Sequence, residues 1–371
     1  MKIEILKKDL LTLLSKTQNI VEKRNTMPIL INVLLEVTEN TLKVYATDLE
    51  VSLTDELSVK VFEIGKVAIS AKNLYELTKE LLEGPIVLTK KENNYLEVKQ
   101  GKFLSKIVGV SADEYPVFPT FNSENINKID SIQFREMIDK TIYSVSNDET
   151  RYHLNGVFFE INNFNKITMV ATDGHRLSLI KKDFKNLNFS ENIGVIIPKK
   201  GLFEIRKLIE NSNIEVFIAV EGSQFIVKSG SCVLMIRLIE GKYPNYQQFI
   251  PQKLDQKIKI PRENILSSLK KVSLLANQKS KAILLKFENN KLEIESNNPD
   301  LGDAKDELEI IYNGPELKIG FNAKYIEDVL KNIENDFVEL ELKDHISPGI
   351  IKPINDNDYI NVVMPMRIWC F

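Results

Sequence analysis

The chain has 371 residues, more than one hydrophobic core usually holds, so its length predicts two or three domains. Its composition, 43% apolar and 27% charged with no apolar run near membrane-spanning length, is typical of a soluble globular protein and excludes a helical membrane protein. The formal net charge of −3 gives no general attraction to nucleic acid or anionic lipid, so nucleic-acid binding would depend on local charge placement.

The first residues do not have the pattern of a signal peptide. Glu4 and Asp9 interrupt the apolar positions, and no small-residue cleavage site follows. The two cysteines, Cys232 and Cys370, lie far apart and have no CxxC spacing. We therefore expect a cytoplasmic protein in a reducing compartment.

Hydrophobic periodicity predicts the elements of the first third of the chain. A strand at residues 1–6 leads into an amphipathic helix at about 8–20, which a basic loop follows. Residues 29–37 and 42–53 are rich in β-branched side chains and are expected to form a pair of strands. Further along we expect a strand at 67–71, a helix at 72–82 and strands at 85–91, 95–100 and 102–110.

This order of elements recurs twice. Three strand-helix segments, VAISAKNLYELTKEL, VIIPKKGLFEIRKLI and KIGFNAKYIEDVLKNI, align so that a lysine falls at the same position in each: Lys72, Lys200 and Lys324. A period of about 125 residues is too long for a solenoid and fits three successive domains of one fold. We predict domains at 1–121, 127–249 and 257–371, each of the α+β class with two helices packed on an antiparallel sheet.

Charge is distributed unevenly over these elements. The six predicted helices together carry a surplus of Lys and Arg, whereas the remainder of the chain is acidic. Helix surfaces are often lysine-rich for solubility alone, so a functional and a purely structural interpretation both remain open.

Residues 167–180, ITMVATDGHRLSLI, place alternating apolar side chains on both sides of Asp173-Gly174, which predicts a tight β-hairpin with a two-residue link. The corner carries Asp173, His175 and Arg176 together. Three interpretations fit it: an acid/base dyad, a turn whose His and Arg cap exposed backbone groups, or a binding corner. Catalysis would need a nucleophile or a metal, and neither the other histidines nor the cysteines have a recognisable spacing for one.

Several motifs, in order along the chain, resemble one known family. The threefold repeat, VATDGHRLSL, RYHLNGVFFE at 151–160, GKYPNYQQFIP at 241–251 and VVMPMRI at 362–368 are similar to the sliding clamp of bacterial DNA polymerase III, its β subunit, over essentially the whole chain. The resemblance implies a non-enzymatic processivity factor that needs neither cofactor nor metal. It would form a ring of two subunits joined head to tail, with helices lining a hole for double-stranded DNA and sheets outside.

The same resemblance implies the partners and leaves two alternatives to be excluded. The partners would be the DNA polymerase III alpha subunit, the clamp loader and other proteins with clamp-binding motifs. The alternatives are a hydrolase that uses Asp173 and His175, and a static, non-specific DNA-binding protein.

The resemblance also assigns three sets of residues. Those expected to face DNA and contact phosphates are Arg24, Lys72, Arg151, Tyr152, Lys199, Lys200 and, by repeat symmetry, Lys324. Those expected to form a pocket for partner peptides are Leu154, Thr172, Gly174, His175, Arg176, Leu177, Pro244, Phe249, Val362, Met364, Pro365, Met366 and Arg367. Those expected at the dimer interface are Phe103, Leu274 and Leu275.

The sequence departs from the family pattern at a few positions. Lys72 and Lys199 stand where the family often has arginine, which keeps the charge without the bidentate fork. Gln248 stands near a position where the family usually has a basic side chain. The chain continues past Ile368 with Trp369-Cys370-Phe371, which we expect either to lie along the rim of the peptide pocket or to be a frayed end.

Overall fold

The computed structural model describes residues 1–18, 20–21, 27–122, 126–162, 166–185, 187, 189, 192–210 and 214–367. Arg24 and the tail at 368–371, with Trp369, lie outside the described residues, so the predictions made for them remain predictions. The chain divides into two compact units. Unit 1 comprises Met1–Arg135, Asn186–Ser190 and Lys200–Leu238, and unit 2 comprises Glu136–Lys185, Glu191–Lys199 and Ile239–Phe371.

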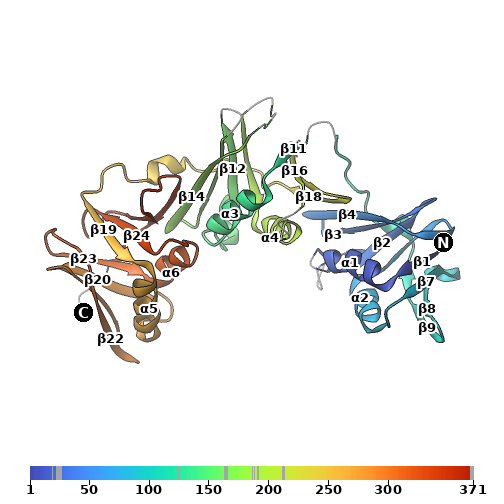
Figure 1. The fold of residues 1–371 in the computed structure, drawn as a ribbon, viewed down its shortest axis with the longest axis horizontal. Helices are drawn as coiled ribbons and strands as arrows, with labels where there is room; N and C mark the ends of the chain where they lie inside the picture. The colour runs from blue at the N-terminus through green and yellow to red at the C-terminus, as the bar shows by residue number, and fades with distance from the viewer. Residues whose placement is uncertain are drawn as a thin grey trace. The chain divides into compact units, whose positions relative to one another are not determined.

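Unit 1 contains two antiparallel sheets (Figure 1). The five-stranded sheet has the strand order β5-β1-β7-β8-β9, and the nine-stranded sheet has the order β10-β6-β2-β3-β4-β18-β17-β16-β11. Its strands are β1 (Lys2–Leu6), β2 (Asn32–Val37), β3 (Thr41–Thr47), β4 (Val51–Ser58), β5 (Lys60–Glu63), β6 (Gly65–Ser70), β7 (Pro85–Lys90), β8 (Leu96–Gln100), β9 (Phe103–Ile107), β10 (Gly109–Val110), β11 (Asn127–Ile129), β16 (Val216–Glu221), β17 (Gln224–Ser229) and β18 (Cys232–Arg237). Helices α1 (Lys7–Thr17) and α2 (Ala71–Glu80) pack on each other and on these strands.

Unit 2 is built in the same way from two further antiparallel sheets. Their orders are β15-β12-β13-β14-β26-β25-β24-β19 and β22-β21-β20-β23. The strands are β12 (Gly156–Asn162), β13 (Lys166–Thr172), β14 (Arg176–Asp183), β15 (Ile193–Pro198), β19 (Gln256–Pro261), β20 (Ala282–Glu288), β21 (Lys291–Asn298), β22 (Gly302–Glu309), β23 (Leu317–Asn322), β24 (Phe337–Leu342), β25 (Gly349–Pro353) and β26 (Tyr359–Val363). Helices α5 (Arg262–Val272) and α6 (Ala323–Lys331) contact each other, while α3 (Ser131–Ile142) and α4 (Lys199–Leu208) each contain a boundary between the two units of the chain.

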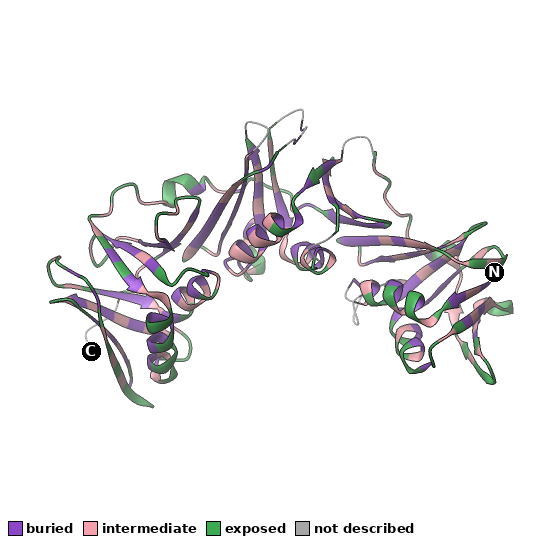
Figure 2. Cartoon of the chain, in the orientation of Figure 1, coloured by how far each residue is buried: buried purple, intermediate pink, exposed green. Residues whose placement is uncertain are grey.

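The predicted class is confirmed, because in the described part of the chain the α-helices come in three successive pairs and the strands of each sheet pair antiparallel. In α1 the buried residues Leu10, Leu13, Leu14 and Thr17 follow helical spacing, whereas β2 and β3 alternate buried and half-buried side chains. Figure 2 shows buried residues on strands and helices alike, whereas the outer strands β9 and β22 carry exposed and half-buried residues. No helix in the described ranges is long and apolar enough to span a membrane.

Several predicted element boundaries were wrong. The strand expected at 29–37 begins only at Asn32, because Pro28–Ile31 form a 3₁₀ helix. The first helix ends at Thr17 and not near residue 20; beyond it the backbone N–H of Ile20 bonds to the Thr17 carbonyl at 3.2 Å, in the tighter 3₁₀ pattern. The stretch at 102–110 is two strands, β9 and β10, with β10 pairing with β6. The stretch at 42–53 is also two strands, β3 and β4, separated by a turn that Asp48 closes.

The Asp48 turn is formed by short-range side-chain bonds. The Asp48 Oδ1 atom accepts the backbone N–H groups of Glu50 at 2.9 Å and Val51 at 2.7 Å, and Leu49 takes a φ of 77°. An aspartate that bonds to amides two and three residues ahead favours a turn over continued strand, whatever the β propensity of its neighbours. The polypeptide therefore reverses within a segment that looked like one strand.

Strands that come from different sequence repeats pair with each other within one sheet. β4 pairs with β18 in unit 1, and β14 pairs with β26 in unit 2. The two units consequently do not coincide with three domains at 1–121, 127–249 and 257–371, since the elements of the central repeat contribute to both units. Those three ranges describe sequence repeats, and their boundaries stay a prediction.

Candidate functional site

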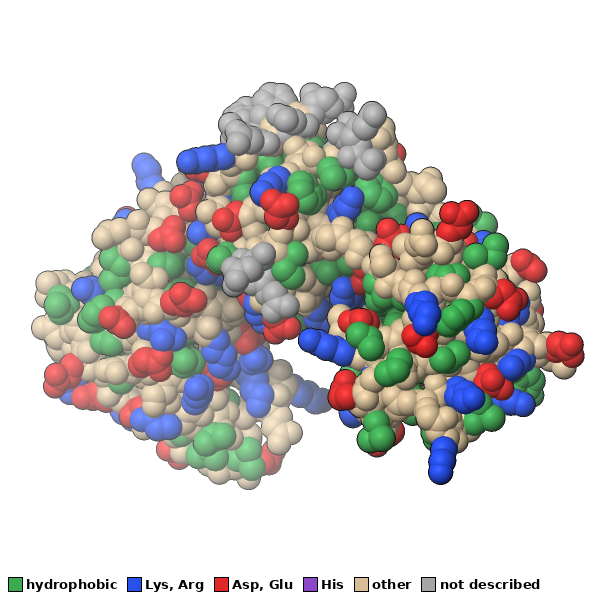
Figure 3. All heavy atoms as spheres, turned by 45° about the vertical axis from the view of Figure 1, so that its right-hand side comes forward, with side chains coloured by type: hydrophobic (Ala, Val, Ile, Leu, Met, Phe, Trp, Pro, Cys, Tyr) green, Lys and Arg blue, Asp and Glu red, His purple; other side chains and the backbone are tan. Residues whose placement is uncertain are grey.

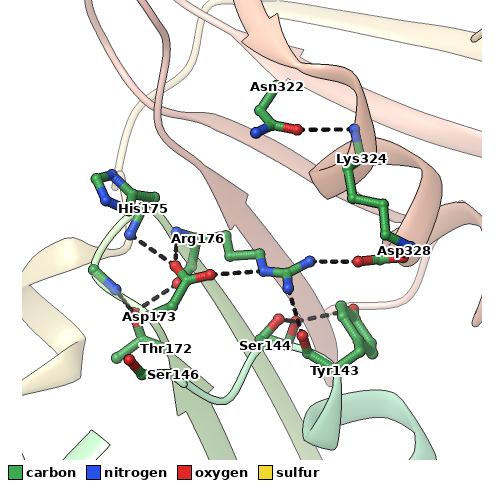
Figure 4. A network of polar contacts seen from close by, with 12 residues as sticks. Tyr143, Ser144, Ser146, Thr172, Asp173, His175, Arg176, Asn322, Lys324 and Asp328 are labelled. Atoms are coloured by element: carbon green, nitrogen blue, oxygen red, sulfur yellow. Dashed lines mark hydrogen bonds and ion pairs between the residues drawn. The ribbon is translucent and has the colours of Figure 1, made fainter. Parts of the chain in front are cut away.

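The predicted hairpin exists, with a turn that is longer than two residues. β13 and β14 pair up to Thr172 and Leu177, which leaves Asp173, Gly174, His175 and Arg176 between them. Only Gly174 in this turn has a positive φ, of 89°, whereas a two-residue Asp-Gly turn of type I′ would need two such residues. The turn is closed instead by Asp173 Oδ1, which accepts the backbone N–H groups of His175 at 2.9 Å and Arg176 at 3.0 Å (Figure 4).

Arg176 connects this turn to helix α6. Its Nε donates to Asp173 Oδ2 at 3.0 Å, its Nη1 donates to Asp328 Oδ2 at 2.8 Å, and its Nη2 donates to the carbonyl of Tyr143 (Figure 4). The guanidinium also lies 4.6 Å from the centre of the Tyr325 ring. Its side chain is 11% exposed, and those of Asp173 and Asp328 are 16% and 13% exposed. These contacts make Arg176 a buried link that positions the turn.

The same contacts argue against a catalytic dyad at the corner. Both oxygens of the Asp173 carboxylate are engaged, one by backbone amides and the other by Arg176, so the carboxylate does not orient the His175 ring. Among the described residues there is also no group of three or more His, Cys, Asp and Glu side chains that could hold a metal ion. The hydrolase interpretation is therefore not favoured.

A small apolar pocket of about 230 Å³ lies against the hairpin in unit 2. We call it the apolar pocket; it is lined by His153, Leu154, Thr172, Gly174, Arg176, Leu177, Pro244, Phe249, Val362 and Met364. Nine of these are residues assigned to the peptide pocket by the resemblance, drawn from four separate stretches of sequence. His153 was not assigned, although it lies next to Leu154 in the motif RYHLNG.

The floor of the apolar pocket is part of a hydrophobic core. Leu154, Leu177 and Val362 are each at most 5% exposed and pack with Tyr243 and Tyr246. At the rim, Phe249 is 54% exposed and Met364 is 42% exposed. A rigid apolar floor beneath an exposed phenyl ring and a flexible thioether suits bulky apolar ligand groups of differing shape.

Four residues assigned to the pocket do not line it. His175 is exposed at the tip of the turn, and Pro365 lines neither this pocket nor its neighbours. Met366 and Arg367 line a different hollow of about 780 Å³, with Lys286, Glu293 and other residues of the four-stranded sheet. The reason is a change of strand partner: Met364 N donates to the carbonyl of His175 at 2.9 Å, whereas Met366 N donates to the carbonyl of Gly320 at 2.8 Å.

Three predicted DNA-facing lysines occupy equivalent places, in the first turn of a helix. In unit 1, Lys72 is exposed on α2, and Lys200 on α4 forms an ion pair with the Asp48 carboxylate, which is 3% exposed. In unit 2, Lys324 on α6 forms an ion pair with Asp328 and is 57% exposed. Their equivalent placement follows from the repeat and agrees with the alignment of the sequence.

The remaining predicted DNA-facing residues in the described part of the chain belong to unit 2. Tyr152 is 57% exposed, and Arg151 forms a 3.0 Å ion pair with Asp148. Hydrogen bonds from Thr150 and Arg151 lower the pKa of the Asp148 carboxyl. Lys199 Nζ donates to Asn147 Oδ1 at 2.9 Å, and burial together with the positive charge of Arg176 lowers the pKa of Lys199. Figure 3 shows Lys and Arg side chains interspersed with Asp and Glu on the face drawn.

The predicted interface residues lie beside outermost strands. Phe103 is on β9, the last strand of the five-stranded sheet, and is 44% exposed. Leu274, in a short 3₁₀ turn (Ser273–Leu275) after α5, is 76% exposed, and Leu275 is half-buried. This turn contacts β22, the last strand of the four-stranded sheet.

Comparisons with known proteins agree over the length of the chain. Family models described as the N-terminal, central and C-terminal domains of the DNA polymerase III beta subunit match residues 1–119, 128–245 and 247–367. The beta sliding clamps of Pseudomonas aeruginosa and Vibrio cholerae are 31% and 28% identical over 369 residues, which is 99% of this chain and 100% of each of those proteins.

Solved structures give the same result. The crystal structure of the DNA polymerase III subunit beta from Pseudomonas aeruginosa has a TM-score of 0.95 at 31% identity, covering 99% of this chain and 100% of that one. The DNA polymerase sliding clamp from Bacillus subtilis also has a TM-score of 0.95, at 25% identity with both chains fully covered. On these three matched domains and this similarity, the chain belongs to the family of the DNA polymerase III beta subunit, the beta sliding clamps.

Proposed function

We propose that this chain is a processivity factor of DNA replication, a sliding clamp that encircles double-stranded DNA and tethers the replicative polymerase to it. The observation that carries the proposal is the succession of three beta-subunit domain matches along one chain. The clamp is not an enzyme, and it acts in the bacterial cytoplasm. Its three domains are residues 1–121, 127–249 and 257–371.

Contact with DNA is electrostatic and independent of sequence. The predicted DNA-facing residues are lysines and arginines with one tyrosine, and such side chains neutralise phosphates without reading base edges. The net charge of −3 supports encirclement over tight binding, because a ring held by topology does not need the strongly basic surface of a static DNA-binding protein.

The apolar pocket receives short, partly apolar peptides from the polymerase III alpha subunit, the clamp loader and other partners. Support comes from its preformed floor and its adaptable rim at Phe249 and Met364. His153 joins the residues assigned by the resemblance. Met366 and Arg367 contribute to the neighbouring hollow instead of this pocket.

The ring is a homodimer closed head to tail. β9 of one subunit meets the β22 region of the other, so that these two outermost strands pair and cover each other's edges. Leu274 and Phe103, exposed on the single chain, become buried in this interface. Of the acidic residues on β22, Asp306 and Glu307 already pair with Lys271 and Lys291, so Asp303 and Glu309 are the more available partners for lysines on the opposite subunit.

The decisive experiment separates topological from electrostatic retention. The clamp is loaded by its loader onto nicked circular DNA, isolated by gel filtration, washed with salt, and then released by cutting the circle. A protein held by six to ten phosphate contacts loses affinity by roughly 10³ to 10⁵ between about 50 and 200 mM salt, whereas a linked ring does not depend on counterion release.

We expect the protein to remain on intact circles through the wash and to leave once they are linearised. The control is the same DNA linearised before loading, from which a ring should slide off. Loss from intact circles at moderate salt would support static DNA binding and contradict the clamp.

A further inference from the structure

A second hollow adjoins the apolar pocket in unit 2 and shares two of its residues. This flanking hollow has a volume of about 520 Å³ and is lined by Gln248, Phe249, Pro251, Gln252, Lys253, Leu254, Lys343, Ser347, Pro348 and Met364. Phe249 and Met364 line both spaces, so they form the ridge between them. A peptide whose apolar residues fill the apolar pocket must cross this ridge to extend into the flanking hollow.

Both walls of the flanking hollow are held in place by the fold. On one side, the 3₁₀ turn Tyr246–Phe249 is fixed by Tyr246, whose hydroxyl donates to Glu160 at 2.8 Å, and Leu254 packs against the core beneath the apolar pocket. On the other side, Asp344 Oδ1 accepts the backbone N–H groups of Ile346 at 3.0 Å and Ser347 at 2.7 Å. The shape is therefore preformed, which lowers the ordering cost of binding.

The charged side chains that line the flanking hollow are all basic. Two of its ten lining residues are lysines, Lys253 and Lys343, both exposed, and none of these described lining residues is acidic. Two acids stand next to lining residues along the chain, and neither lines the hollow. Asp344 has its carboxylate committed to the turn just described, and Asp255, which follows Leu254, is exposed. The hollow around Met366 differs, because Glu293 and Glu295 line it beside its lysines.

We propose that the flanking hollow binds acidic residues that lie next to the apolar anchor of a partner peptide, with Lys253 and Lys343 meeting the carboxylates. This inference rests on the proposed peptide-binding function of the apolar pocket and assigns to it a specificity for acidic flanking sequence. Further hydrogen-bond donors come from both sides of the hollow: the amide groups of Gln248 and Gln252 on one side and the Ser347 hydroxyl on the other. Because the lysines are exposed, they select among peptides and set the salt dependence more than they hold the anchor.

The test compares matched fluorescein-labelled peptides by fluorescence polarisation. Each peptide carries a Leu-Phe anchor, and either Glu-Glu or Gln-Gln stands directly before or directly after it. The proteins are the full-length chain, a Lys253→Gln/Lys343→Gln double variant, and a Lys279→Gln control. Lys279 is exposed in unit 2 and lines neither the pocket nor the flanking hollow.

We expect one of the two Glu-Glu peptides to bind the unchanged chain about fivefold more tightly than its Gln-Gln counterpart at about 50 mM salt, which is the size expected for two exposed ion pairs. This advantage should disappear in the double variant and at about 300 mM salt, and it should persist in the Lys279→Gln control. The Gln-Gln peptides should bind all three proteins equally.

Two results would overturn the inference while leaving the apolar pocket intact: no advantage for either Glu-Glu peptide, or an advantage that survives in the double variant. A double variant that weakens the neutral and acidic peptides equally would also overturn it, since the lysines would then support the anchor. If no peptide binds the unchanged chain, the proposed peptide-binding function itself fails, and the inference falls with it.

Discussion

Asp328→Asn tests whether helix α6 holds the pocket hairpin through Arg176. Asp328 Oδ2 accepts from Arg176 Nη1 at 2.8 Å, and the two side chains are 13% and 11% exposed. The substitution keeps the size of the side chain and removes its charge. The substitution also removes the ion pair between Asp328 and Lys324, so the effect of that second contact has to be measured separately.

The expected loss is set by what Arg176 retains. A hydrogen bond to a charged group contributes about 1.5–3 kcal/mol to the free energy of unfolding, and breaking a fully buried ion pair costs about 3–5 kcal/mol. Arg176 keeps Asp173 and the carbonyl of Tyr143 as partners, so it is not left as an isolated buried charge. We therefore expect a loss of about 2 kcal/mol, which corresponds to a fall in Tm of about 4–8 °C for a unit of this size.

Differential scanning calorimetry measures the change, and Lys324→Gln is the matched control. Lys324 is the second partner of the same carboxylate, and at 57% exposure its ion pair should contribute less than about 1 kcal/mol. If Asp328→Asn lowered Tm no more than Lys324→Gln does, helix α6 would not hold the hairpin through Arg176. An unchanged Tm would mean that Asp173 and Tyr143 alone suffice to hold the guanidinium.

Three further predictions concern the proposed dimer interface, the thiol of Cys232 and the carboxyl group of Glu136. The double substitution Leu274→Glu and Leu275→Glu should give folded monomers in sedimentation at micromolar concentration, because charge would be buried in the proposed dimer interface. A dimer that persists would show that the interface lies elsewhere. Burial raises the pKa of the Cys232 thiol to about 12, so in a Cys370→Ser background a thiol reagent at pH 8 should label the protein only on unfolding, and rapid labelling of the folded chain would contradict this. Burial alone would raise the pKa of Glu136, but hydrogen bonds from two lysines bring it below its ordinary 4.5. The carboxylate therefore stabilises the fold above that pH, and the Tm difference between the unchanged chain and Glu136→Gln should be present at pH 7 and shrink as the pH falls below 4.5; a difference that is independent of pH would rule out this linkage.

Most of the elements and their repetition could be predicted from the sequence. Helical spacing placed Leu10, Leu13 and Leu14 on one face of α1, and alternation placed the strands, because both patterns depend only on which residues lie a few positions apart. The threefold alignment put Lys72, Lys200 and Lys324 at the first turn of three helices, where the structure also has them. Motif order led to the family, and nine of thirteen assigned pocket residues lie together.

Local turn chemistry was missed where strand propensity dominated the interpretation. Asp48 ends β3 and Asp173 ends β13, each by accepting backbone N–H groups two and three residues ahead. The tripeptide Ala-Thr-Asp, which ends at Asp48 in the first repeat and at Asp173 in the second, indicates such a turn. The turn at Asp48 can be recognised only by comparison with the turn at Asp173, since the residues around Asp48 have the composition of a strand.

How distant segments meet at the site follows from tertiary contacts that no single stretch of sequence contains. Asp328 reaches Arg176 from another repeat, and His153 joins the pocket wall because its neighbour Leu154 packs in the core. Met364 and Met366 are two residues apart and line different hollows, since one backbone amide bonds to His175 and the other to Gly320. Such pairings depend on the burial and hydrogen bonding of chain segments that are far apart in sequence. The periodicity of a single stretch therefore cannot predict them.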